Sequence, residues 1–321
     1  MSDEAAVSGL LVVDKPAGIT SHDVVNRLRR VYGTKKVGHA GTLDPMATGV
    51  LIMGIGKATR LLNFLQGTAK EYRATARFGV TTSTEDAEGE VLAETACDLD
   101  IERVREAAAK FVGEISQVPP MVSAIKVNGE ALYKAARRGE EVEREPRTVR
   151  IYALEVESFD PESQSATLYV KCSSGTYIRT LGADLGAALG CGAHLTALRR
   201  LSVGSFKESE SVRLGDLQEM ERADAEARIL PMHEAMRDFP RRVVDEAELD
   251  DVSHGRELVA QQAPMRLGEL PMMSMKRTGD RPAHEAGMTA GIPVGIIGPD
   301  GELVAVYRRS AKGLKPAAVL I

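Results

Sequence analysis

Three short segments of the sequence contain side chains that could take part in chemistry. The segments GHAGTLDP, KEYR and SSGTYIRT contain Asp44, Tyr72 and Arg179. A carboxylate can act as a nucleophile or steady a developing positive charge, an aromatic ring can stack on a planar ligand, and a guanidinium stays charged at any physiological pH. Each residue also fits an ordinary role, because Asp before Pro is common in turns and an inward Tyr usually belongs to a core. These residues alone leave both explanations open.

Motifs for bound cofactors are incomplete. In the stretch ending GIGKATR, Leu51 and Ala58 stand where a phosphate-binding loop needs Gly and Ser or Thr, and Thr59 breaks a dinucleotide-binding pattern. Ser123 and Lys126 match S-x-x-K, but the Ser-Asp-Asn and Lys-Thr-Gly motifs that accompany it in β-lactamases are absent. The six histidines and three cysteines lack metal-ligand spacing. We therefore expect no cofactor and no metal site.

The overall composition is that of a folded protein. The chain has 321 residues, of which 43% are hydrophobic and 27% charged. This length suggests about two domains. The longest apolar stretches stop far short of the ~20 residues that span a membrane, and the acidic start of the chain differs from a secretory signal. With few cysteines and no disulfide framework, the expected location is the cytoplasm.

Charge is distributed unevenly along the chain. The net charge is −5, yet residues 11–80 contain 11 basic and 4 acidic residues, whereas residues 208–260 contain 7 basic and 15 acidic residues. A polyanion responds to the local field within a Debye length of about 8–10 Å, so a basic face could bind nucleic acid. Such blocks are also common on solvated surfaces, and charge alone decides nothing here.

Hydrophobic periodicity and turn chemistry predict the elements that would position the candidate residues. Residues 10–14 (LLVVD) indicate a buried strand, and a helix follows with Ser21 as its expected N-cap and Gly33 as its stop. Residues 34–48 are rich in turn formers, so Asp44 is expected in a loop.

Strict alternation over residues 70–80 predicts a half-buried strand with Tyr72 at one end of its inward face. Asp100 is the expected N-cap of a further helix. The other predicted elements are a helix at 58–65, strands near 149–159 and 166–172, a Gly- and Ala-rich helix after Arg179, helical segments within 208–235 and 246–254, a mobile loop at 261–290, and strands at 291–310 with a turn at 299–301. This mixture indicates an α+β fold with a small β-rich second domain.

Six blocks of the sequence, taken together, resemble the bacterial tRNA pseudouridine-55 synthase family in order and separation. They are GLLVVDKPAGITSHDVV, GHAGTLDPMATGVL, KEYRATARFG, TEDAEG, SSGTYIRTLGADLG and CGAHLTALRRLSVGSF. The resemblance covers about residues 9–215 and implies a catalytic domain over residues 1–235 with a mixed, mostly antiparallel sheet. From about residue 240 the chain is similar to a small PUA-like β-rich domain, which gives a second domain at 240–321.

This resemblance implies an enzyme that isomerises uridine 55 in the T arm of tRNA to pseudouridine. The reaction conserves atoms, so it needs no redox or group-transfer cofactor. The target nucleotide is stacked inside a folded loop, so the enzyme must flip it out at a cost of a few kcal/mol. The implied partner is tRNA, with no membrane and no obligate protein partner, and we expect a monomer.

The resemblance also implies roles for individual residues. Asp44 matches the catalytic aspartate, and Arg179 matches the arginine that pairs with it. Tyr72 matches the tyrosine beside the target base, where it could stack or help remove the C5 proton. The remaining matches are Tyr177 and Leu198 as lining of the uracil pocket, His39 as the ring that fills the vacated stack, and Lys15 as a residue that supports the site.

The segment at residues 121–150, which we expect to lie outside the core of the domain, matches a family insertion that grips the T arm. Its candidate RNA contacts are Lys134, Arg137 and Arg138. The sequence departs from the family pattern at Ala40, where Thr is common, and residues 261–290 have no counterpart.

Two other classes of protein remain compatible with the sequence. A uridine C5-methyltransferase acting on the same arm would need a cysteine nucleophile, and none of Cys97, Cys172 and Cys191 lies in a recognised motif. A non-catalytic RNA-binding module would use the same basic surface without chemistry.

Overall fold

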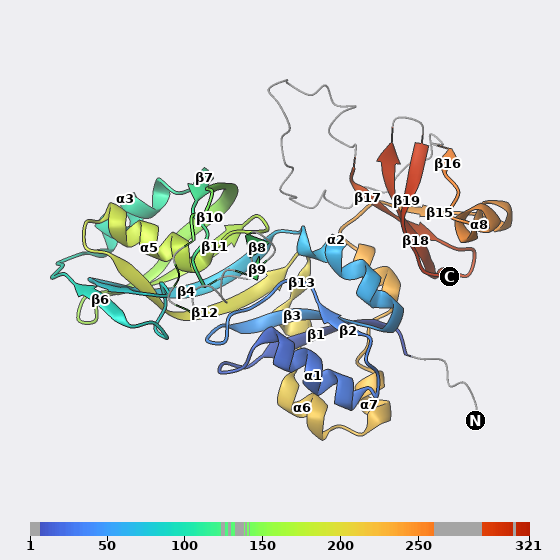
Figure 1. Ribbon diagram of the computed structural model, residues 1–321, viewed down its shortest axis with the longest axis horizontal. Coiled ribbons are helices and arrows are strands. Elements are labelled where there is room, and N and C mark those ends of the chain that lie inside the picture. Colours follow the sequence, from blue (N-terminus) through green and yellow to red (C-terminus); the bar gives the residue numbers. More distant parts are fainter. Residues whose placement is uncertain are drawn as a thin grey trace. The chain divides into compact units, whose positions relative to one another are not determined.

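The computed structural model describes residues 7–122, 126–127, 130–131, 138, 140, 142–259, 291–310 and 313–321. The chain forms two compact units (Figure 1). The first unit contains the chain up to Asp44, residues 49–68 and everything from Val203 onward, and the second contains Pro45–Thr48 and Ala69–Ser202. The domain bounds expected from the sequence, 1–235 and 240–321, stay a prediction.

The first unit is built on a buried N-terminal strand. Strand β1 (Gly9–Lys15) pairs antiparallel with β3 (Thr48–Ile55) and parallel with the short β14 (Val212–Arg213). Strand β2 (Val37–His39) pairs antiparallel with the other edge of β3, so that His39 faces Met53 in register. The predicted strand at 10–14 is thus confirmed as β1. The apolar residues that follow the Asp44 loop form β3, which lies next to β1.

Helix α1 (Ser21–Val31) begins one residue earlier than expected, because its N-cap is Thr20. The Thr20 hydroxyl accepts from the Asp23 N–H at 3.1 Å, and the Asp23 carboxylate accepts from the Thr20 N–H at 2.9 Å. The prediction that Ser21 caps the helix was therefore wrong. Gly33, with φ of +60°, ends the helix as expected.

The other helices of the first unit are short. The predicted helix at 58–65 is a 3₁₀ turn, η1 (Gly56–Leu61), that continues into α2 (Leu62–Gln66). The region 208–235, expected to be helical, forms several short pieces, and the short strand β14 lies between the first two of them. These pieces are η2 (Glu208–Glu210), α6 (Leu214–Glu219), α7 (Arg222–Glu226) and η3 (Met232–Met236), and β13 (Phe206–Lys207) precedes them.

The C-terminal part is β-rich, as predicted. Its five strands run in the order β15, β17, β18, β19 and β16, and their bounds are Arg241–Val243, Pro293–Ile297, Leu303–Ser310, Gly313–Val319 and Leu258–Val259. Helix α8 (Glu246–Ser253) confirms the predicted helical segment. The turn at 299–301 is also confirmed, since the Gly301 N–H donates to the Gly298 carbonyl at 3.0 Å and Gly301 has φ of +84°.

Two apolar clusters hold this C-terminal part. One lies within it and includes Tyr307 and Ile296. The other joins Leu303 and Leu320 to side chains of β1 and α2, such as Leu10 and Leu65. The C-terminal strands therefore share a core with the N-terminal strands of the first unit.

The second unit is a largely antiparallel sheet covered by helices. The strand order is β12 (Ala193–Val203), β4 (Lys70–Phe78), β11 (Ser165–Cys172), β10 (Arg147–Asp160) and β7 (Gly113–Gln117). Side chains along β4 alternate strictly between buried and more exposed, which confirms the predicted strand and its inward Tyr72. The strands predicted near 149–159 and 166–172 are confirmed as β10 and β11.

Helices and short hairpins complete the second unit. Helix α3 (Ile101–Ala109) has the predicted N-cap, because the Asp100 side chain accepts from the Arg103 N–H at 2.8 Å. Helix α3 contacts β10 and α5 (Ile178–Ala188), and α5 contacts β4. The hairpin strands are β5 (Val80–Thr82) with β6 (Val91–Glu94), and β8 (Lys126–Val127) with β9 (Glu130–Ala131).

None of the helices in the described part of the chain has the length and apolar character needed to cross a lipid bilayer. The predicted mobile loop at 261–290 lies outside the described residues.

Candidate functional site

The loop that carries Asp44 is anchored from two sides. The Ser21 hydroxyl accepts from the Leu43 N–H at 2.8 Å and donates to the Leu43 carbonyl at 3.1 Å. At the start of the loop the Ala40 N–H donates to the Ile52 carbonyl at 2.8 Å, which ties the loop to β3. Asp44 directly follows Leu43 and is partly exposed. A fixed backbone thus presents the carboxylate where a ligand can reach it.

Lys15 and His39 belong to the same unit as Asp44. Lys15 ends β1 and is fully buried, and its ammonium donates to the Pro16 carbonyl at 2.9 Å. A buried cation is costly unless it is hydrogen-bonded, so the carbonyl bond helps to keep it there. His39 ends β2 and is half-buried. Their predicted roles stay predictions.

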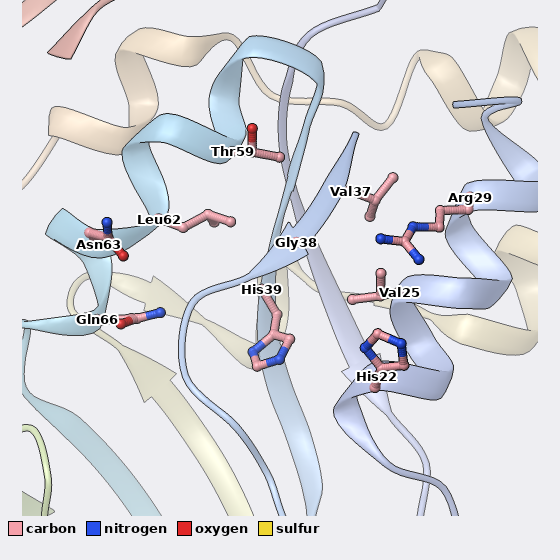
Figure 2. A pocket seen from close by; sticks show the side chains of 10 residues that line it. All are labelled: His22, Val25, Arg29, Val37, Gly38, His39, Thr59, Leu62, Asn63 and Gln66. Carbon is pink, nitrogen blue, oxygen red and sulfur yellow. The ribbon is translucent and has the colours of Figure 1, made fainter. Parts of the chain in front are cut away.

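An open pocket of about 460 Å³ adjoins His39 (Figure 2). One wall comes from α1, the opposite wall from η1 and α2, and β2 lies between them. The lining contains His22, Val25 and Arg29 from α1, Val37, Gly38 and His39 from β2, and Thr59, Leu62, Asn63 and Gln66 from η1 and α2.

Arg179 lies in the first turn of α5 and is only 3% exposed. Its Nη1 donates to the Thr84 carbonyl at 2.7 Å and its Nη2 to the Val122 carbonyl at 2.8 Å. Its Nε lies 3.6 Å from Oδ2 of Asp86, which is also buried. Because a buried guanidinium needs both a counter-charge and hydrogen-bond acceptors, these partners explain how the cation is held in one orientation.

Asp86 is a candidate that the sequence analysis left without a role. Its side chain accepts from the Thr84 hydroxyl and from the Glu88 N–H. The same turn pairs with β12, since the Leu195 N–H donates to the Glu85 carbonyl at 3.0 Å. The one feature of the sequence that could have indicated a role for Asp86 is its place in the block TEDAEG, which is similar to the family. Taken alone, however, an aspartate at this position is typical of an ordinary turn.

Glu85 sits beside this ion pair in an unusual backbone conformation. Its φ is +62°, a value that side chains other than glycine rarely adopt. The Thr180 hydroxyl donates to its carboxylate at 2.7 Å. Burial raises the pKa of Glu85, and this effect outweighs the opposing hydrogen bond from Thr180 and the charge of Arg179. The turn therefore places two largely buried carboxylates, Glu85 and Asp86, beside the Arg179 guanidinium, with Glu85 in a strained backbone conformation.

The aromatic and apolar candidates of the second unit are on its sheet and at the start of α5. Tyr72 on β4 and Leu198 on β12 are both 7% exposed. Tyr177 is the residue before α5, and its peptide is clamped by the Gln117 carboxamide. The Tyr177 N–H donates to Gln117 Oε1 at 3.1 Å, and the Tyr177 carbonyl accepts from Gln117 Nε2 at 3.2 Å. The peptide that leads into the helix with Arg179 is thus fixed.

Lys70 is a buried lysine on the same face of β4 as Tyr72. Burial lowers the pKa of Lys70 to about 7, with a further lowering from the charge of Arg200. Cys172 lies opposite Lys70 in register, and burial raises the pKa of its thiol to about 12. Sequence reasoning assigned no role to this lysine.

The structure brings the predicted residues into two groups. Lys15, His39 and Asp44 belong to the first unit, and Tyr72, Tyr177, Arg179 and Leu198 belong to the second. The predicted pairing of Arg179 with Asp44 stays a prediction.

Of the expected RNA contacts, Lys134 and Arg137 lie outside the described residues. Arg138 is described, and it forms an ion pair with Glu140 at 2.8 Å. Within the described residues no group of His, Cys, Asp and Glu side chains is arranged to hold a metal ion.

Two family models match adjoining parts of the chain. Residues 29–178 match the TruB family pseudouridylate synthase (N terminal domain), and residues 179–237 match the tRNA pseudouridylate synthase B C-terminal domain.

Curated relatives and a solved structure are similar over most of the chain. A tRNA pseudouridine synthase B from Arthrobacter sp. (strain FB24) is 46% identical over 319 residues, covering 98% of this chain and 96% of the relative. One from Mycobacteroides abscessus is 50% identical over 266 residues, covering 80% and 87%. A crystal structure of a Cbf5-Nop10-Gar1 complex contains a chain with a TM-score of 0.71 and 27% identity, covering 98% of this chain and 85% of that one.

Proposed function

This chain belongs to the TruB family of tRNA pseudouridine synthases, and from that premise we propose that it isomerises uridine 55 in the T arm of tRNA to pseudouridine. In this reaction the N1–C1′ bond of the nucleotide breaks, the uracil turns while it is held, and C5 bonds to C1′. The C5 proton leaves and N1 takes up a proton, so no atoms are supplied by a cofactor. The observation that carries the proposal is 46% identity with a synthase over 98% of the chain.

Asp44 is the proposed catalytic residue. Its loop is held at Leu43 by both hydrogen bonds of the Ser21 hydroxyl, so the carboxylate is presented from a rigid backbone. In an ionised state it can attack the ribose or the uracil ring, or stabilise positive charge at C1′ as the glycosidic bond weakens. Partial exposure keeps it accessible to a nucleotide that enters from solvent.

Arg179 is the proposed ion-pair partner of Asp44. A nearby positive charge favours the carboxylate form, and a guanidinium cannot lose its proton to the substrate. Its bonds to the Thr84 and Val122 carbonyls and its approach to Asp86 support a fixed orientation. The role is therefore one of positioning and charge.

The uracil is proposed to lie against Tyr72, Tyr177 and Leu198. Tyr72 and Leu198 are nearly buried, which suits the stacking and apolar contacts that hold a flat ring while it turns. Tyr72 is better suited to stacking than to taking the C5 proton, because a neutral phenol is a weak base.

Base flipping supplies the remaining roles. The target must leave the T loop before its C1′ can be reached. We assign His39 to the space that the nucleotide vacates and Lys15 to support of the site. Lys134, Arg137 and Arg138 are the proposed contacts to the T-arm backbone, where cations displace counterions from phosphates.

The proposal is tested by the release of tritium from a tRNA transcript labelled at C5 of uridine, without added cofactor. We expect release by the wild type and a loss of about a thousandfold or more in Asp44→Asn, which keeps the shape and removes the charge. The matched control is Asp98→Asn, an exposed aspartate in a loop of the second unit, which should retain full activity. A transcript with cytidine at position 55 should release no tritium from the T arm.

The outcomes separate the proposal from its alternatives. Full activity of Asp44→Asn would refute the catalytic role of Asp44. Tritium release that persists with cytidine at position 55 would refute the proposal that uridine 55 is the target. A requirement for a methyl donor would indicate a methyltransferase. Tight tRNA binding without any product would indicate a binding module.

A further inference from the structure

We propose that Cys97 and Cys191 form a redox-sensitive pair, which closes into an intramolecular disulfide when the protein meets a small-molecule disulfide as oxidant. The bond would join the segment after β6 to the turn between α5 and β12. It is a modification site within the second unit, and it does not depend on the proposed function.

Backbone hydrogen bonds bring the two cysteine-bearing segments together around Gly79. The Thr95 N–H donates to the Gly79 carbonyl at 2.7 Å, and the Gly79 N–H donates to the Gly192 carbonyl at 3.0 Å. Cys97 lies two residues beyond Thr95, and Cys191 lies directly before Gly192. A single residue therefore connects the backbone segments of both cysteines, although they are far apart in the sequence.

The missing side chain of Gly79 leaves room for a sulfur atom between these segments. A Cβ at Gly79 would lie 3.0 Å from Cys97 Sγ, so the sulfur occupies the space that a side chain would take. The φ of Gly79 is +84°, a conformation that favours glycine. The two thiols interact directly, since the charge of Cys191 and a side-chain hydrogen bond with it add to burial in raising the pKa of Cys97.

Both cysteines are held in place by further hydrogen bonds. The Cys97 thiol donates to Gln164 Oε1 at 3.6 Å, and the same oxygen accepts from the Leu99 N–H at 3.0 Å. The Cys191 N–H donates to the Gly186 carbonyl at 3.2 Å, at the end of α5. Because little freedom is left to lose when the bond closes, each thiol has a high effective concentration at the other.

The third cysteine differs from this pair. Cys172 is fully buried on β11, where it lies opposite Lys70 in register, and burial raises the pKa of its thiol to about 12. Cys97 is partly exposed, whereas Cys191 is 7% exposed. An oxidant dissolved in water therefore reaches Cys97 first, and Cys191 acts second.

The reaction with a small disulfide is balanced in two steps. The Cys97 thiolate attacks one sulfur of the oxidant, the bond between its two sulfurs breaks, and one thiolate leaves. The Cys191 thiolate then attacks the Cys97 sulfur of this mixed disulfide and releases the second thiol. Two electrons pass to the oxidant, and the protons of the two cysteines end on the released thiols. Because the pKa of Cys97 is raised, little thiolate is present and closure is slow.

The first experiment maps the bond in the wild type, in a buffer of reduced and oxidised glutathione at about pH 8. Free thiols are then blocked in denaturant, and trypsin places the three cysteines in separate peptides, 78–103, 172–179 and 180–199. We expect mass spectrometry to find 78–103 joined to 180–199 about tenfold or more in excess over any link to 172–179. Absence of the link, or similar yields of all three links, would overturn the inference.

Two variants test the order of the steps. In Cys191→Ser the second thiol is missing, so glutathione should stay on Cys97 as a mixed disulfide. The matched control is Cys172→Ala, in which the link between 78–103 and 180–199 should form as in the wild type. If Cys97 instead bonds to Cys172 in Cys191→Ser at the wild-type rate, the inference is wrong, because any other thiol would then serve.

The third experiment asks whether the bond fits the native fold. Urea unfolding, followed by far-ultraviolet circular dichroism, compares the linked protein with the same sample after reduction. We expect the linked protein to unfold at a midpoint about 1 M higher, since the bond closes a long loop in the unfolded chain. An equal or lower midpoint would overturn the inference, because the bond would then require a distorted fold.

Discussion

The buried lysine at position 70 makes the stability of the protein depend on pH in a direction that can be worked out. The pKa of Lys70 falls from 10.5 to about 7 in the folded chain, chiefly through burial, whereas in the unfolded chain it returns to its ordinary value. Between these values the unfolded state binds more protons than the folded state, so the free energy of unfolding rises with pH. The penalty for charging Lys70 is complete below about pH 6 and disappears as the pH approaches 10.5.

The size of the effect follows from the same two values. Each tenfold change in the protonation equilibrium is worth about 1.4 kcal/mol, so the drop from 10.5 to about 7 corresponds to a penalty of about 5 kcal/mol for the charged form. Between pH 6 and 9, about 2–3 kcal/mol of this penalty is relieved. The Cys172 thiol, with a pKa of about 12 in the folded chain, stays neutral there, whereas in the unfolded chain it ionises around its ordinary pKa of 9.0; this opposing effect is only about 0.4 kcal/mol at pH 9.

We predict that Lys70→Met removes this dependence. The substitution nearly keeps the length of the side chain and puts no charge in the buried site. The free energy of unfolding of the variant should therefore exceed that of the wild type most at pH 6 and progressively less towards pH 9. The measurement is urea unfolding followed by far-ultraviolet circular dichroism, which suits a chain without Trp. Lys110→Met, which alters an exposed lysine of the same unit, is the control and should leave the pH profile unchanged.

Parallel pH profiles for wild type and Lys70→Met would refute the reasoning. They would mean that water or a counter-charge in the folded protein satisfies the ammonium.

Two further predictions concern other features of the second unit. Asp100→Ala should lower the free energy of unfolding by about 1 kcal/mol, because the Arg103 N–H at the start of α3 loses its acceptor; urea unfolding against Asp98→Ala would check this. Burial and the neighbouring thiol of Cys191 raise the pKa of Cys97, so iodoacetamide should alkylate Cys97 several times more slowly at pH 8 than a peptide thiol. Mass spectrometry after timed labelling measures this rate, and a rate equal to that of the peptide would contradict the prediction.

Local signals predicted much of the fold. Alternation along β4 placed Tyr72 on the buried face, and the cap at Asp100 and the stop at Gly33 followed from backbone chemistry. The error at the start of α1 has a physical cause that was visible in the sequence. Thr20 has Asp23 three residues later, which completes a capping box, whereas the residue three after Ser21 is Val24 and cannot return a hydrogen bond.

Other features depend on tertiary contacts and could not be predicted in the same way. Strand β12 lacks a clean alternation and carries Arg200 at 1% exposure, so its pattern does not indicate a strand. The importance of Asp86 depends on its approach to Arg179, which is distant in sequence and reaches it only through the folded turn. Ser21 likewise gains its role from Leu43, which follows it by 22 residues.

The way the second unit interrupts the first has a consequence for how the chain is made. Leu10 exchanges two backbone hydrogen bonds with Leu230, at 2.9 and 2.7 Å, and shares an apolar cluster with Leu320. Strand β1 therefore can pair with β3 early in synthesis but lacks its contacts with Leu230 and Leu320 until the segment after Val203 has been made, while residues 69–202 emerge as one continuous stretch. In the interval its apolar side chains lack part of their native contacts, and this exposed apolar surface of the first unit favours aggregation.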